Sequence, residues 1–133
     1  MAKGKRQSAL LVEIIIAVLF FALSATVILD VFATAYARSA YAQASTEAMI
    51  EAQNLSELIY VSTDAEALLL NEGFVKTGDE WLREEQAFDL RVQFTREEAE
   101  AGELLTARIA ALSGEQTLIE LPCVRYIPGE VTR

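Results

Sequence analysis

The chain contains no histidine, and Cys123 is its only cysteine. Without histidine it lacks the commonest general base, the commonest zinc ligand and any Ser-His or Cys-His catalytic pair. A lone cysteine also excludes a disulfide bond within the chain. We therefore expect a protein that is not an enzyme and that holds neither a cofactor nor a metal.

Basic residues are scarce as well: the 133 residues include 11 basic and 20 acidic side chains, for a formal net charge of −9. Three of the basic residues, Lys3, Lys5 and Arg6, lie in the first eight positions, which contain no acid. The remainder has 8 basic against 20 acidic residues, a charge of −12. Because such a surface repels phosphate backbones, we expect no direct binding to nucleic acid.

Glycine and proline are absent from residues 9–62, a stretch that predicts one continuous helix of about 54 residues. Its first 21 residues, Ala9 to Leu29, contain a single charge. As a helix they would be about 31 Å long, which matches a hydrocarbon core of about 30 Å. We predict a basic leader at 1–8, a transmembrane half-helix at 9–30 and an extracytoplasmic domain at 31–133. The leader stays in the cytoplasm under the positive-inside bias.

Glu13 is the single charge of this apolar run. An acidic residue at the centre of a span costs roughly 2.5–3.5 kcal/mol on the insertion scale, so such residues are functional candidates. The alternative is a stray charge near the membrane edge whose side chain reaches the headgroups. We favour a Glu13 carboxylate that meets a cation.

Beyond the span the helix becomes amphipathic, with apolar residues at spacings of three and four and charged residues off their stripe. The stripe consists of Ala37, Tyr41, Ala44, Ala48, Ala52, Leu55 and Ile59. We predict that it packs on a core.

A second, short helix is predicted from about Asp64 to Glu72. Thr63 and Glu66 have the spacing of a capping box, and Gly73 supplies a stop. The alternative is that the long helix simply frays here.

After Gly73 the apolar period changes from 3.6 to 2, which is typical of half-buried strands. The predicted strands are Phe88 to Thr95, Leu105 to Ala111 and Thr117 to Tyr126, the last bent at Pro122 after a turn at 113–115. Phe74 to Lys76 and Trp81 to Arg83 can add a short strand or hairpin. The order of these elements, helices first and then strands, indicates an α+β fold. In it the long helix packs on a small antiparallel meander of three to five strands.

Several residues could have a functional role, but we assign structural roles to them. We assign Cys123, Trp81, Phe88 and Phe94 to the core. Asp30 marks the outer membrane interface.

The acidic stretch 96–103 could suggest a calcium site. It lacks the Asp/Asn/Gly alternation of a dedicated calcium loop. We favour a solvated inter-strand loop or helical turn.

The basic leader followed by Ser8-Ala9-Leu10-Leu11-Val12-Glu13-Ile14-Ile15-Ile16-Ala17 resembles the processing site of type IV prepilins and pseudopilins. In that family the leader is removed before the hydrophobic segment, and glutamate is the fifth residue of the mature chain. The resemblance implies cleavage between Ser8 and Ala9 by a prepilin peptidase, N-methylation of Ala9 and a pilin-like fold. It also implies assembly into a filament, with other pilin or pseudopilin subunits, a membrane platform and its ATPase as partners.

The physical argument agrees with this resemblance, because cleavage would free an α-amino group at Ala9 that a neighbour's Glu13 could neutralise. Two positions depart from the family, which usually has Gly where Ser8 stands and Phe or Met where Ala9 stands. Together with the lack of a cysteine pair, these departures favour a pseudopilin or minor pilin over a major pilin. The alternatives are a single-pass anchored domain that does not polymerise, or an exported domain cut after the A-x-A sequence at 35–37.

Overall fold

The computed structural model describes residues 2–129, and its elements follow the predicted order of two helices and then strands. The chain divides into two compact units, the N-terminal unit Met1–Tyr41 and the sheet unit Ala42–Arg133. Helix α1, Ala2–Val61, contributes residues to both. We describe each unit by itself.

Helix α1 is continuous over 60 residues, which confirms the predicted long helix. It begins at Ala2, inside the leader, and not at Ala9. The reason is local: residues 2–8 include no proline and are rich in good helix formers such as lysine, arginine and glutamine. The helix ends where the Ser62 hydroxyl donates to the Ile59 carbonyl at 3.0 Å.

Helix α2, Ala65–Asn71, confirms the predicted short helix but not its predicted cap. The N-cap is Asp64, whose Oδ1 accepts from the backbone N–H groups of Glu66 (3.1 Å) and Ala67 (3.2 Å). Thr63, expected in that role, lies one residue too early. Gly73 stops the helix as predicted, with φ of +84°, a conformation that glycine adopts without strain.

The sheet has five strands, the upper limit of the prediction. They are β1 (Val75–Thr77), β2 (Glu80–Glu84), β3 (Asp89–Ala99), β4 (Gly102–Ser113) and β5 (Gln116–Pro128). Each pairs antiparallel with its neighbours in the order β1-β2-β3-β4-β5, a simple meander. The register runs unbroken through Pro122, where we predicted a bend, and the register shift of β4 and β5 lies at Ala111 and Leu112.

The acidic stretch 96–103 is neither a loop nor a helical turn, so that prediction is wrong. Strand β3 continues to Ala99 and β4 begins at Gly102, which leaves only residues 100 and 101 in the turn. Arg96 and Glu103 form a diagonal ion pair across these strands, with Nη1 and Oε2 3.5 Å apart. Cross-strand pairing therefore overrides a composition that reads as a loop.

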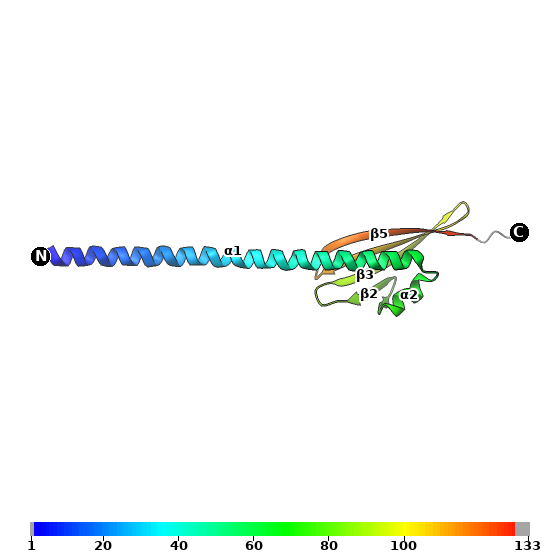
Figure 1. The fold of residues 1–133 in the computed structure, drawn as a ribbon, viewed down its shortest axis with the longest axis horizontal. Coiled ribbons are helices and arrows are strands. Elements are labelled where there is room, and N and C mark those ends of the chain that lie inside the picture. The colour runs from blue at the N-terminus through cyan, green and yellow to red at the C-terminus, as the bar shows by residue number, and fades with distance from the viewer. Residues whose placement is uncertain (1, 130–133) are drawn as a thin grey trace. The chain divides into compact units, whose positions relative to one another are not determined.

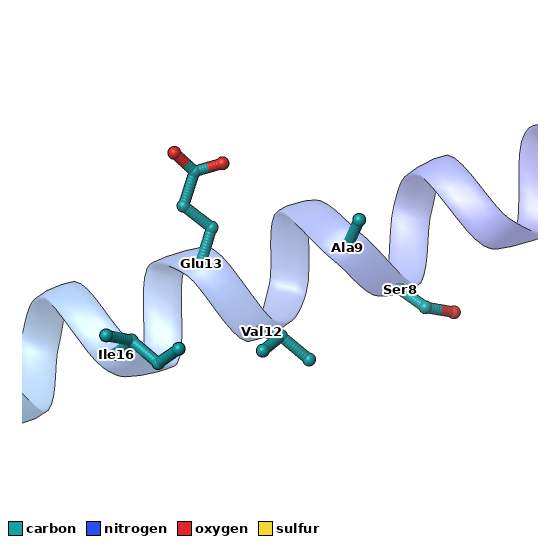
Figure 2. Close-up of a pocket in the computed structure, with 5 residues that line it drawn as sticks. All are labelled: Ser8, Ala9, Val12, Glu13 and Ile16. Atoms are coloured by element: carbon teal, nitrogen blue, oxygen red, sulfur yellow. The ribbon is translucent and has the colours of Figure 1, made fainter.

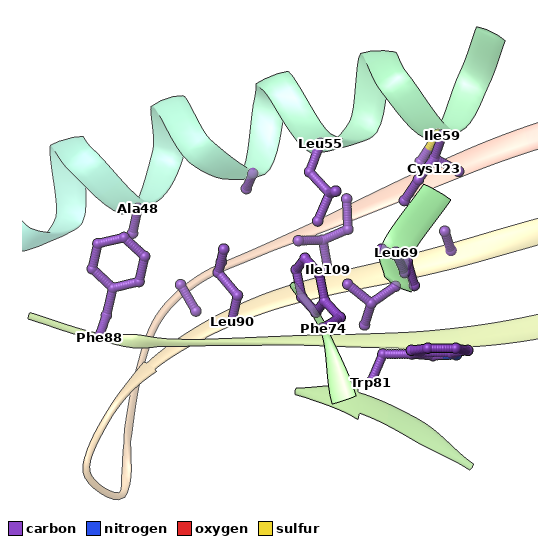
Figure 3. Packing of buried hydrophobic residues seen from close by; sticks show 14 residues of the cluster. Ala48, Leu55, Ile59, Leu69, Phe74, Trp81, Phe88, Leu90, Ile109 and Cys123 are labelled. Atoms are coloured by element: carbon purple, nitrogen blue, oxygen red, sulfur yellow. The ribbon is translucent and has the colours of Figure 1, made fainter. Parts of the chain in front are cut away.

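The core of the sheet unit lies between the C-terminal part of α1 and one face of the sheet (Figure 1, Figure 3). The helix buries four residues of the predicted stripe: Ala48, Ala52, Leu55 and Ile59. The predicted core residues Trp81, Phe88 and Cys123 are buried too, and Phe94 packs against the cluster half-buried. Ala44 is half-buried, whereas Ala37 and Tyr41, which belong to the N-terminal unit, are exposed.

Candidate functional site on the N-terminal helix

The N-terminal unit exposes an apolar surface around the whole helix. Every leucine, isoleucine, valine and phenylalanine from Leu10 to Phe32 is more than half exposed. So large an apolar surface is unfavourable in water and marks a segment that contacts lipid or protein. By length and composition α1 is able to cross a membrane, and its position near the N-terminus suits a membrane anchor or a signal sequence.

The two hydroxyl groups of the apolar run are satisfied within the helix. Ser24 Oγ donates to the Phe20 carbonyl at 2.9 Å, and Thr26 Oγ1 donates to the Ala22 carbonyl at 3.0 Å. Such back-bonding lets small hydroxyl side chains enter an apolar environment at little cost. Glu13 is the remaining polar side chain between Ala9 and Leu29.

The Glu13 side chain is exposed and directed away from the helix axis (Figure 2). None of the ion pairs found among residues 3–129 includes its carboxylate. An apolar environment would therefore leave this charge uncompensated by the described part of its own chain. A cation that compensated it there would have to lie outside these residues.

Ala9 and Glu13 lie on the same side of the helix, four residues or about one turn apart (Figure 2). Ser8 points to a different side, where its hydroxyl donates to the Gly4 carbonyl at 2.9 Å. The structure thus brings together two of the three predicted site residues. The hollow that Ser8, Ala9, Val12, Glu13 and Ile16 line is a strip of helix surface and not an enclosed cavity.

In the intact chain the Ala9 nitrogen is a peptide amide inside α1 and carries no charge. A cation arises here only if the bond between Ser8 and Ala9 is broken. The site therefore consists of one carboxylate that has no ion pair within residues 3–129, and of a peptide nitrogen one turn away that would become an amine only on cleavage.

Sequence reasoning missed two basic residues that hold the sheet unit together. Arg83 contacts Glu51 of α1, and Arg125 donates from Nη1 to the Ser62 and Ile59 carbonyls at the end of that helix. The alternation of the strands could have indicated this. Arg83 lies two residues after buried Trp81, and Arg125 lies two residues after buried Cys123. That spacing places both arginines on the inner face of the sheet.

Comparisons with protein-family models, with curated proteins and with solved structures find no match to this chain.

Proposed function

We propose that the chain is a pseudopilin or minor pilin subunit, processed at its N-terminus and assembled through its helix into a type IV pilus or type II secretion-like filament. One observation carries the proposal: the Glu13 carboxylate, which forms no ion pair among the described residues, lies on an apolar helix one turn after Ala9 and shortly after the basic residues of positions 3–6. A helix packed on a small antiparallel sheet is compatible with a pilin-like fold. In this reading the protein has a structural role and catalyses no reaction.

Processing supplies the missing cation. Cleavage between Ser8 and Ala9 by a prepilin peptidase frees an α-amino group at the level of the membrane where Glu13 lies. A neighbouring subunit's Glu13 can pair with this amine, and each charge then offsets the cost of burying the other. N-methylation of the Ala9 amine, which the family resemblance implies, keeps it cationic.

The leader is helical, and this places a condition on its cleavage. The bond to be cut lies about two turns from the start of α1, so the peptidase must open these turns to reach it. Helix ends fray, and local opening near a terminus costs little free energy. The basic leader stays in the cytoplasm, the sheet unit is exported, and a membrane platform with its ATPase moves the subunit into the filament.

N-terminal sequencing of the mature protein tests the processing step. A chain that starts at Ala9 supports the proposal. A start at Arg38 would instead indicate an exported domain released by signal peptidase, and an intact leader would indicate a plain single-pass anchor. Either of these two results would overturn it.

Glu13→Ala and Glu13→Gln test the assembly step. We expect both variants to lose their leader normally but to enter filaments at least about 100-fold less, since removing one partner of a buried ion pair costs about 3–5 kcal/mol. The measurement is the amount of subunit in sheared filaments relative to the membrane. Asp30→Asn, at the second acid of the N-terminal unit, is the matched control and should assemble normally. Normal assembly of both Glu13 variants would contradict the proposed pairing.

A further inference from the structure

Strand β5 forms one edge of the sheet and is its longest strand, at 13 residues. Within residues 2–129 no other strand pairs with its outer side. Long exposed edges are templates on which another chain can add a strand. The sequence of β5, with Leu118, Ile119, Leu121 and Val124 in close succession, is also of the apolar, β-prone type that favours such pairing.

The ladder with β4 fixes which backbone groups of β5 face outward. From Ile119 to Pro128 the register with β4 is unbroken. The Gly129 N–H extends the same ladder inward and donates to the Ala101 carbonyl at 2.9 Å. In an antiparallel pair, successive residues direct their N–H and C=O groups to alternate sides. Odd-numbered residues of this stretch therefore bond to β4, and even-numbered residues present their backbone to the outside.

Both prolines of the chain occupy this outward-facing set, at Pro122 and Pro128. Proline has no N–H to donate, and in sheets it is confined to edges where the missing donor faces away from the ladder. Between the two prolines only Val124 and Tyr126 keep an outward N–H, and both side chains are about half exposed, at 55% and 48%. Between the prolines, an added strand could therefore accept hydrogen bonds from at most two adjacent outward N–H groups.

The opposite edge is protected in another way. Strand β1 has only three residues, and Lys76 at its centre carries a charge that pairs with Glu66 of α2 at 3.8 Å. Short edge strands and edge lysines both discourage strand addition.

We infer that Pro122 and Pro128 close the β5 edge against strand addition, so that the sheets of neighbouring copies do not join edge to edge. The inference holds whether or not the chain enters a filament. In a filament, the closed edge means that copies contact each other through helices and side-chain surfaces. In a crowded membrane it prevents irreversible pairing of sheet domains.

The test is a disulfide reporter on the outer edge in the full chain, dispersed in a mild detergent. Two β5 strands that pair antiparallel about Val124 would place these residues opposite each other about 5.5 Å apart between Cα atoms, within the range a disulfide bridges. The reporter is therefore Val124→Cys, combined with Cys123→Ala so that it is the only thiol. Oxidation and non-reducing gels then measure the rate of dimer formation.

With both prolines present we expect slow cross-linking. Pro122→Val together with Pro128→Val restores two outward donors per chain, or four in the pair. It should raise the rate by about tenfold or more, a factor that even two modest net hydrogen bonds give. Thr106→Val is the matched control, because Thr106 pairs with Val124 on the outer face but lies in β4, an interior strand. It adds the same apolar side chain without freeing an edge donor, and the rate should not change.

Equal rates with and without the prolines would overturn the inference, as would an equal increase in the Thr106→Val control. Trp81 fluorescence checks that each variant is folded. If the double variant does not fold, Pro122→Val alone decides the question, because it joins the outward donors of residues 120, 122, 124 and 126 into one uninterrupted set.

Discussion

Replacing Arg83 with methionine should destabilise the sheet unit by about 2 kcal/mol. The Arg83 side chain is 18% exposed, and its Nη2 lies 3.1 Å from Glu51 Oε2 of α1. Its Nη1 donates to the Glu72 carbonyl at 3.1 Å. Its Nε lies 2.7 Å from Glu85 Oε1, an ion pair without hydrogen-bond alignment. The guanidinium also lies over the Phe74 ring, 4.9 Å from its centroid.

The expected loss of stability depends on how far these contacts are exposed to solvent. A hydrogen bond to a charged group contributes about 1.5–3 kcal/mol net. The three carboxylates that surround Arg83 are 36–46% exposed, so water screens them and each further ion pair adds at most about 1 kcal/mol. Methionine keeps part of the apolar contact with the Phe74 ring but leaves the carboxylates without a cation. Because water screens these contacts, we take about 2 kcal/mol, within the range for a single hydrogen bond to a charged group and below the sum of the two that Arg83 donates.

Trp81 provides the assay, since it is the only tryptophan and is 3% exposed in the core. Its fluorescence should follow unfolding of the sheet unit in urea with the full chain in detergent. Arg91→Met is the matched control: Arg91 Nε lies 3.3 Å from Glu80 Oε2 in a pair with side chains 44% and 35% exposed, which predicts a loss of at most about 1 kcal/mol. An Arg83→Met variant as stable as the wild type, or no less stable than Arg91→Met, would refute the reasoning.

Two further test substitutions, each with a control, can be followed by the same fluorescence. Asp64→Ala removes the N-cap of α2 and should cost about 1 kcal/mol, whereas Asp64→Asn, which can still cap, should cost little; equal losses would contradict a capping role. Gly102→Ala would place a Cβ 2.2 Å from the Ile127 carbonyl oxygen and 2.9 Å from the Gly129 nitrogen, so the backbone has to move. We expect a loss of about 1–3 kcal/mol, and none for Gly4→Ala, where no atom lies within 4 Å; an unchanged Gly102→Ala would contradict the close approach.

Much of the fold could be predicted because burial imposes its period on the sequence. The stripe residues Ala48, Ala52, Leu55 and Ile59 recur at helical spacing, and all four are buried. The strands were recognisable where apolar residues alternate. Prediction failed at 96–103, since charged side chains there follow no apolar period and only pairing with β4 makes them a strand.

The candidate site was predictable for a similar reason. Four residues make about one helical turn, so a helix through Ala9 and Glu13 has to place them on one side. The Arg83 contacts could not be found in this way. Glu51, Glu72 and Glu85 come from three separate segments, and only the packing of α1 and α2 on the sheet brings them to one guanidinium.

Glu13 and Arg83 show two ways for a charge to exist beside apolar surfaces. Arg83 finds carboxylates from its own chain, so its charge stabilises its own fold. Glu13 finds no such partner among the described residues, so in an apolar environment its charge favours contact with another molecule. If that molecule is a second copy, one cation that could meet Glu13 is an α-amino group at Ala9, which does not exist while the leader is attached. Pairing with that amine would then have to follow cleavage, so chains that all keep their leader could not pair through it even with an intact Glu13.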